Sequence, residues 1–527
     1  MRALLLSIGY QYWILPVLLA LPLVGAVAVL LTGRAGADGE DEVVSGAARA
    51  PRSLATIIFA IEFLLSLGLW WSFEPTFAGW QQSFDRAWIP AWGIRFTLGL
   101  DGISLMMVLL TTFIMLLSSY GSFTYIRRKT RAYYALLLVL TTGMLGVFMA
   151  LDLFLFYVMW EAMLIPMYFI IGIWGGTRRI YASLKFFIYT FLGSLLMLVG
   201  IVYLGNAQPG GVANFSYDAI LANAHLSSRA ALWLFGAFFL AFAVKVPMFP
   251  LHTWLPDAHV EAPTAGSVVL ASIMLKLGTY GFLRLALPLF PGAAMHPTVR
   301  TVVLVLAVIG IVYGALMSMV QPDFKKLVAY SSVSHLGFVM LGIFALTVES
   351  VQGALMVMIN HGISTGALFF LIGMMYERRH TRMLDSYGGI ARVVPMFAAL
   401  LTLVSFSSIG LPGTNGFIGE FLVLLGAFRT TPVLTFIATV VVILAAVYLL
   451  WAIQRILFNP LDKVENEHMP DLNRRELLVM APLVALIIWL GVYPAPVLRR
   501  MEVSSEKFVR TVETRAAGRI DFASEGR

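Results

Sequence analysis

The chain has 527 residues, of which 60% are hydrophobic and only 12% are charged, and its formal net charge is +8. Soluble globular domains carry about 25% charged residues, so this composition excludes a soluble protein and indicates a polytopic membrane protein. The basic residues stand in short loops between apolar segments, which argues against a nucleic-acid partner. The absence of cysteine excludes disulfides and thiolate-held iron–sulfur clusters in this chain.

Apolar segments long enough to cross a bilayer follow one another along the whole chain. A span needs roughly 20 apolar residues, so we expect an all-α fold with about 14 transmembrane helices. The first segment is too long for a signal peptide and is followed at once by others, so it is predicted to be a span. The predicted spans are 3–32, 53–74, 100–123, 132–150, 152–175, 182–205, 229–256, 259–290, 300–320, 325–346, 351–376, 394–426, 433–457 and 476–497.

The loops between these spans alternate in charge. Because cytoplasmic loops carry the excess of Lys and Arg, the alternation places both termini on the outer, periplasmic side. The compact chain suggests a bacterial inner membrane. The loops predicted to be cytoplasmic hold Arg34, Arg49 and Arg52; Arg127, Arg128, Lys129 and Arg131; Arg178 and Arg179; Lys325 and Lys326; Arg378, Arg379 and Arg382; and Lys463, Arg474 and Arg475.

Two of the predicted spans are interrupted. Pro247 and Pro250 break the seventh span, and the segment Gly410–Gly413 breaks the twelfth. Proline removes a backbone donor, and broken helices are tolerated in a membrane only inside protein or against water. Paired breaks are typical of inverted-repeat transporters, so we expect two inverted five-helix repeats, spans 4–8 and 9–13. The chain would then divide into 1–131, the repeats 132–290 and 291–457, and a C-terminal helix and tail, 458–527.

Several predicted spans contain an ionisable residue. Such residues cost about 2.5–3.5 kcal/mol at the centre of a membrane and usually mark an ion path. Histidine titrates near neutrality and can relay a proton through its two nitrogens, while Glu and Lys can bind and release one. We therefore predict a hydrated polar axis that carries protons through the bilayer. Its residues are Glu161, Lys245, Lys276, His335, His361 and Glu420.

Other polar residues near the spans have simpler interpretations. His252 and His259 flank the turn after the first break, and either a relay role or anchoring of that turn is open. Lys185 and Arg284 are expected to extend toward the surface from span ends, and Asp152 to cap a helix. The histidine spacing fits no metal motif, and no glycine-rich phosphate loop follows a strand, so no metal or cofactor site is expected in this chain.

Four segments carry a resemblance to the antiporter-like subunits of respiratory complex I, the NADH:quinone oxidoreductase. They are 100–105, 242–271, 324–338 and 360–382, and the resemblance covers about residues 90–460. The same superfamily includes subunits of multi-subunit cation/proton antiporters and membrane-bound hydrogenases. The L-type and N-type subunits usually have a lysine where this chain has Glu420, whereas the M type has a glutamate, so the resemblance favours the M type.

This resemblance implies a proton-translocating role coupled to electron transfer in other subunits. NADH, FMN, iron–sulfur clusters and quinone would bind to partner subunits, and L-type and N-type subunits would lie on either side of this chain in the bilayer. The implied roles are a coupling pair (Glu161 and Lys245), a central lysine (Lys276), a linking relay (His335 and His361) and an exit residue (Glu420).

Three alternatives share most of these features. One is a subunit of a Na+/H+ antiporter or an ion-pumping hydrogenase, against which Glu420 argues. Another is a passive scaffold, in which the buried charges only hold helices together. The third is the photosynthetic relative of complex I, which takes its electrons from ferredoxin.

Overall fold

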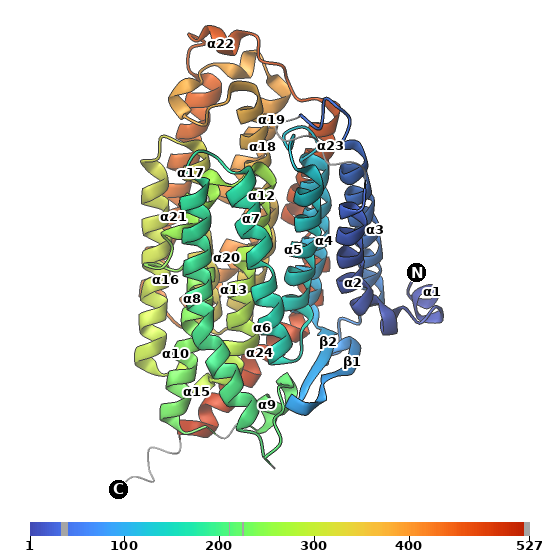
Figure 1. The fold of residues 1–527 in the computed structure, drawn as a ribbon. Helices are drawn as coiled ribbons and strands as arrows, with labels where there is room; N and C mark the ends of the chain where they lie inside the picture. The colour runs from blue at the N-terminus through green and yellow to red at the C-terminus, as the bar shows by residue number, and fades with distance from the viewer. Residues whose placement is uncertain (33–40, 210, 224–225, 521–527) are drawn as a thin grey trace.

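The computed structural model describes residues 1–32, 41–209, 211–223 and 226–520. It shows an elongated bundle of helices that run roughly parallel to one another (Figure 1). Residues 33–40, between the first two predicted spans, lie outside the described residues.

The N-terminal helices form one side of the bundle, and α3 packs between α2 and α4. α4 begins where the side chain of Asp101 accepts hydrogen bonds from the backbone amides of Ile103 and Ser104, a standard N-cap. These helices are α1 (Arg2–Ser7), α2 (Tyr10–Leu30), α3 (Arg49–Ser72), α4 (Gly102–Gly121) and α5 (Thr130–Met149).

The next part of the chain contains the first break. α10 ends at Lys245, and a new helix begins only at Trp254 after a stretch of turns that includes two prolines. The helices here are α6 (Leu153–Ala162), α7 (Leu164–Trp174), α8 (Arg179–Asn206), α9 (Tyr217–Asn223), α10 (Ser228–Lys245), α11 (Trp254–Glu261), α12 (Thr264–Val269), the π-helical η2 (Leu270–Met274), α13 (Leu275–Gly281), the π-helical η3 (Phe282–Ala286), α14 (Leu287–Leu289) and α15 (Pro291–Ala294).

The C-terminal half contains the second break. α19 ends at Gly410, whose φ of 83° is left-handed, and α20 begins at Asn415. The helices are α16 (Pro297–Met319), α17 (Phe324–Ala345), α18 (Val348–Arg379), the short η4 (Leu384–Ser386) and η5 (Ile390–Arg392), α19 (Pro395–Ile409), α20 (Asn415–Phe428), α21 (Pro432–Ile453), the π-helical η6 (Gln454–Phe458), α22 (Val464–Glu467), α23 (Arg474–Val492) and α24 (Ala495–Ile520).

The expected multi-span helical fold is confirmed. Among the described residues, 13 helical segments are long and apolar enough to cross a membrane, and α19 and α20 are two further, shorter apolar helices. Together α19 and α20 occupy the span predicted at 394–426. The seventh span was predicted to end at residue 256, but α10 ends at Lys245. The segment 246–263 between α10 and α12 holds the separate short helix α11, which contains His259.

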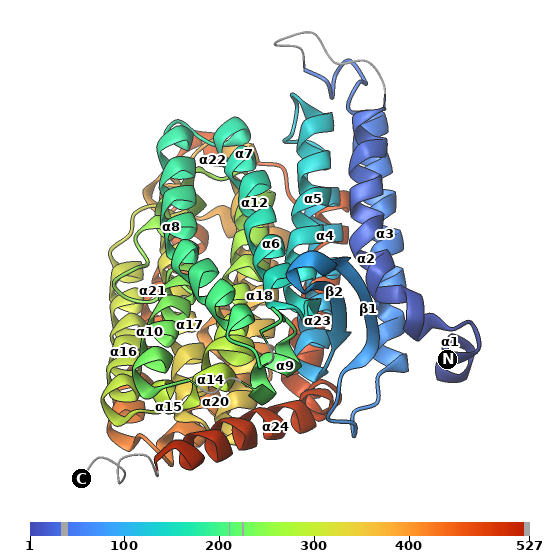
Figure 2. The ribbon, with the colours of Figure 1, turned by 60° about the horizontal axis from the view of Figure 1, so that its bottom comes forward.

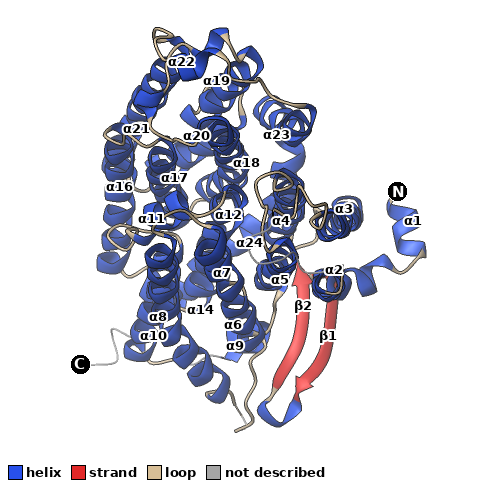
Figure 3. Ribbon diagram, turned by 45° about the horizontal axis from the view of Figure 1, so that its top comes forward, coloured by secondary structure: helices blue, strands red, loops and turns tan. Residues whose placement is uncertain are grey.

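Besides several short helices, a hairpin and the long helix α24 lie mostly outside the predicted spans. An antiparallel hairpin, β1 (Gln81–Ile89) and β2 (Ile94–Leu100), is joined by the short η1 (Pro90–Trp92). Figure 3 shows it beside the helices, and Figure 2 shows α24 lying across the same end of the bundle. The loops after α4, α7, α18 and η6 lie at the opposite end, which is here called the basic end because it holds most of the basic loop residues.

The middle of the bundle is formed by α12–α14, α17 and α18. The apolar windows of Thr264–Leu289 and Val348–Arg379 are fully buried, whereas fewer than half of the residues in those of α2, α8 and α23 are buried. The helices that carry Lys276, His335 and His361 are therefore enclosed by other helices, and the polar side chains on them are shielded from lipid.

Candidate functional site

Four of the six ionisable residues predicted from the sequence form a connected row in the middle of the bundle. They come from α13, α18, α17 and α20, which lie far apart along the chain. The order along the row is Lys276, His361, His335 and Glu420.

Lys276 starts this row from a widened stretch of helix. Its side chain is fully buried on α13, which stands between two π-helical segments. The ammonium group donates to the carbonyl of Ala271, within the first π segment, and lies 2.7 Å from Nδ1 of His361. π-helical turns are rare and often occur at functional sites, and here one provides an acceptor for a buried amine.

The other end of the row is a histidine–carboxylate contact. Nδ1 of His335 lies 2.9 Å from Oε1 of Glu420, and both side chains are buried. The rings of His335 and His361 meet edge to face, with their centroids 5.5 Å apart. The row therefore contains two direct contacts between proton-exchanging groups, separated by one gap between the two rings.

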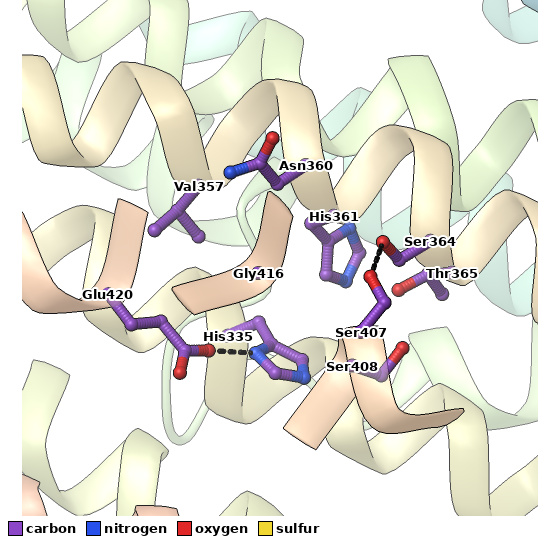
Figure 4. A pocket seen from close by; sticks show the side chains of 10 residues that line it. All are labelled: His335, Val357, Asn360, His361, Ser364, Thr365, Ser407, Ser408, Gly416 and Glu420. Atoms are coloured by element: carbon purple, nitrogen blue, oxygen red, sulfur yellow. Dashed lines mark hydrogen bonds and ion pairs between the residues drawn. The ribbon is translucent and has the colours of Figure 1, made fainter. Parts of the chain in front are cut away.

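A small cavity lies beside the two touching rings, where the hydrogen-bonded row is interrupted (Figure 4). It measures about 20 Å³, and about 10–15 Å³ is enough to hold one water molecule that has polar neighbours. Both histidines and Glu420 line it, together with hydroxyl groups of α18 and α19. Among these, Ser364 and Ser407 are hydrogen-bonded to each other at 2.6 Å. The cavity can therefore hold a water that bridges the two imidazoles.

Glu161 and Lys245 form a second group, and they do not contact each other. Glu161, in the last turn of α6, accepts a hydrogen bond from the hydroxyl of Ser194 on α8. Lys245 is 1% exposed, and its Nζ has no hydrogen-bond partner among the described residues. It lies over the rings of Trp160, at 5.5 Å, and Phe186, at 5.4 Å. The predicted coupling pair is thus present as two adjacent groups held by different partners.

His252 and His259 join neither group by a hydrogen bond. The buried ring of His252 stacks on Phe249 at 5.7 Å. His259 is fully buried, stacks on Phe369 of α18 at 4.7 Å, and has no partner for either ring nitrogen within the described chain. A relay role for these two residues therefore stays a prediction.

Two simpler predictions have clear outcomes. Asp152 caps α6, because its side chain accepts from the amides of Phe154 and Leu155. Arg284 was predicted to extend to the surface, and this prediction is wrong. It is buried and pairs with Asp101 at 2.7 Å. The charge-assisted hydrogen bond to this carboxylate stabilises the guanidinium inside the bundle.

Sequence reasoning missed the neutral polar residues that hold the charged ones. Ser194 binds Glu161, and the side-chain oxygen of Asn415, at the start of α20, accepts from the hydroxyl of Ser407, which in turn accepts from that of Ser364. Asn415 directly follows the second break, which is a usable signal, whereas a single serine in an apolar helix such as α8 gives none. Within the described ranges, no cluster of three or more His, Asp or Glu side chains could hold a metal ion.

Comparison with known proteins gives one consistent family. Residues 150–447 match the family described as NADH:quinone oxidoreductase/Mrp antiporter, TM. NADH-quinone oxidoreductase subunit M of Rhodobacter capsulatus is 45% identical over 490 residues, which are 92% of this chain and 93% of that protein.

Solved structures agree with this relationship. A chain of respiratory complex I from Thermus thermophilus with bound NADH is 32% identical with a TM-score of 0.84, and the match covers 94% of this chain and 99% of that one. A chain of the Mrp complex from Dietzia sp. DQ12-45-1b is 22% identical with a TM-score of 0.77, over 97% of this chain and 56% of that one. The Mrp likeness shows a shared fold, while the matches to subunit M and complex I cover both chains almost completely.

Proposed function

Because this chain belongs to the subunit M family of NADH-quinone oxidoreductases, we propose that its buried Glu, Lys and His residues are the path by which it translocates protons. The chain is a membrane subunit of that enzyme. In this proposal electrons pass from NADH through FMN and iron–sulfur clusters to quinone in partner subunits, and this chain supplies only groups that bind and release protons.

The observation that carries the proposal is the contact of 2.7 Å between Nζ of Lys276 and Nδ1 of His361. An ammonium at this distance can pass its proton directly to a neutral imidazole. Nε2 of His361 is buried and has no hydrogen-bond partner among the described residues, so it is the atom from which the proton would continue through water to His335. Glu420 would then accept it from Nδ1 of His335.

Glu161 and Lys245 provide the switch in this proposal. Glu161 is held by Ser194, which leaves the buried Lys245 without a counter-charge within 4 Å among the described residues. A turn of the Glu161 side chain from Ser194 toward Lys245 would stabilise the charged lysine. That pairing would cancel the field of the ammonium, and its opening would leave an uncompensated positive charge that repels the proton of Lys276 along the row toward Glu420, because charges interact strongly across a low-dielectric interior.

The setting in the complex is part of the same proposal. L-type and N-type subunits would flank this chain, and its basic end would face the cytoplasm of a bacterium with both termini on the outer side. α7 and α8 carry many exposed large apolar residues, as expected of helices that face lipid or a neighbouring subunit. Examples are Ile165, Phe169, Ile188, Leu192 and Leu196.

The test is the Glu161→Gln variant in membranes that carry the complete complex. We expect NADH-to-quinone electron transfer and proton pumping to fall together, while native gels show a complex of normal size. Glu349→Gln is the matched control, because Glu349 is partly exposed and its ion-pair partner among the described residues is the exposed Arg429. Normal turnover and pumping in an assembled Glu161→Gln complex would mean that the buried charges are a scaffold.

A further inference from the structure

Glu62 is a buried acid that the proposed path does not use. It lies near the middle of α3, it is 0% exposed, and neither of its carboxylate oxygens has a hydrogen-bond partner within the described chain. A carboxylate without a partner inside a membrane is very costly, so this side chain carries a proton in the arrangement described. A glutamate kept for structural reasons would be expected to hold a partner, and this one holds none.

No charged group on the neighbouring helices can act as its counter-ion. α3 packs against α1, α2, α4 and α5. The one charged residue of α1, Arg2, pairs with Glu74 at 2.6 Å, and Arg500 of α24 lies over Trp70, near the end of α3 that is opposite the basic end. α2 and α4 contain no Asp, Glu, Lys, Arg or His, and in α5 the only such residue is Arg131, at the basic end. The remaining charges of α3 itself, Arg49 and Arg52, lie in its first turn at the same end. The protonation of Glu62 is therefore not fixed by an ion pair.

Hydroxyl groups lie on either side of Glu62 along the interface of α3 and α4. Ser66, one turn further along α3, is hydrogen-bonded to Thr112 at 2.7 Å. Toward the basic end, Thr56 and Ser119 make a second hydroxyl pair, also at 2.7 Å. Hydroxyls both donate and accept, so they are suitable groups to pass a proton to or from a carboxyl placed between them.

α4 lies between α3, which carries Glu62, and the central helices α12 and α18 (Figure 3). The face of α4 that points away from α3 packs on α12, η2 and α18, where Leu110 lies against Gly362, the residue after His361. Only α4 stands between α3 and the helices of Lys276 and His361. Packed helix axes are about 8–10 Å apart, so two such spacings put about 16–20 Å between the axis of α3 and those central helices. Charges at that separation still interact appreciably where the surroundings are apolar.

We propose that Glu62 is a second proton-binding site of this chain, which releases and rebinds one proton in each cycle as the charge on the Lys276–His361 pair changes. The proposal rests on the proposed proton path. The proton leaves the carboxyl, is relayed by the hydroxyl groups of the α3–α4 interface to water at the basic end, and returns by the same route, so no other reactant is required. A positive charge on Lys276 favours the ionised carboxylate, and loss of that charge favours the acid.

The test uses the whole complex with Glu62→Gln, which keeps the shape of the side chain and cannot release a proton. Two quantities are measured, the protons pumped per electron and the infrared difference spectrum between NADH-reduced and oxidised enzyme. We expect the variant to lose a band in the carbonyl-stretch region of protonated carboxyl groups and to pump fewer protons per electron. Thr112→Val, a milder change that removes the hydroxyl partner of Ser66, should lower the pumping ratio in the same direction.

Glu161→Gln in the same assays separates the two proposals. If Glu161→Gln loses pumping while Glu62→Gln keeps the wild-type spectrum and pumping ratio, Glu62 is an inert buried acid and the proposed path stands. If Glu161→Gln also pumps normally, the proposed path fails and the role of Glu62 fails with it.

Discussion

His335 of α17 and Glu420 of α20 are 85 residues apart in the sequence, yet their side chains are in contact, with Nδ1 of the histidine 2.9 Å from a carboxylate oxygen. α17 and α20 both pack on α18, which brings His361 to the other side of His335. The carboxylate fixes which histidine nitrogen faces the second break and leaves the other nitrogen to face the cavity. The contact therefore gives the row a direction, with Glu420 at its end.

Replacing this carboxylate should interrupt the row at its last step. In Glu420→Gln, the amide can still contact Nδ1 of His335 but cannot accept and hold a proton. We expect proton pumping and NADH-to-quinone electron transfer to fall by an order of magnitude or more, since loss of a proton-transfer group typically costs about 10²–10⁴-fold in rate. Pumping in sealed vesicles is the measurement. Turnover equal to that of the Glu349→Gln control would contradict the assigned role.

Lys276→Met should separate function from stability. The buried ammonium contacts only a carbonyl and an imidazole, so its charged form has no counter-ion among the residues that contact it. Replacing such a charge with an apolar side chain is often neutral or stabilising. We therefore expect a complex that resists heat at least as well as wild type but does not pump. Lys129→Met, at an exposed loop position, is the control, and a large loss of assembly would show that Lys276 is mainly structural.

Much of the fold was accessible from the sequence, because a membrane demands long apolar helices and the charges of the loops mark their ends. The hairpin 81–100 and α24 were missed for the same reason. Neither needs the apolar composition of a span, and both lie across the end of the bundle. The extent of the first break was also predicted wrongly, since proline indicates that a helix is interrupted but not where the next helix begins.

The candidate site was predictable only in part. Glu161, Lys276 and Glu420 stand out because a charge within an apolar helix is rare. Their partners do not, since Ser194 resembles the many small residues that pack helices together. Likewise, the burial of Arg284 depends on its contact with Asp101, which is 183 residues away in the sequence. No local sequence pattern predicts that these two residues pair.

The Asp101–Arg284 pair should be a stability element at the end of the bundle opposite the basic end. Burial alone raises the pKa of Asp101, but the charge and hydrogen bond of Arg284 outweigh it and hold that pKa below its ordinary value. Asp101→Asn leaves Arg284 buried without its carboxylate, which typically costs about 3–5 kcal/mol. The expected result is a lower temperature of thermal inactivation of the purified complex, and an unchanged temperature would contradict it.

The pH dependence of this effect has a definite sign. A folded-state pKa below the unfolded value gives stability that is present above the ordinary carboxyl range and lost as the pH falls through the lowered pKa. The difference between wild type and Asp101→Asn should therefore be constant at neutral pH and shrink only in strong acid. Asp218→Asn is the control, because its carboxylate accepts only from the exposed edge of Trp80.

Gly410 controls the position of Glu420 through the backbone of the second break. Its φ of 83° is left-handed, and a Cβ placed on it would lie 3.0 Å from Oε2 of Glu420. Gly410→Ala should therefore lose about 1–2 kcal/mol of stability from backbone strain and displace the carboxylate from His335, so that pumping falls as well. Gly236→Ala, inside α10 with no atom within 4 Å of the new Cβ, should be neutral or stabilising. Equal thermal stability and equal pumping in the two variants would show that the break does not depend on this glycine.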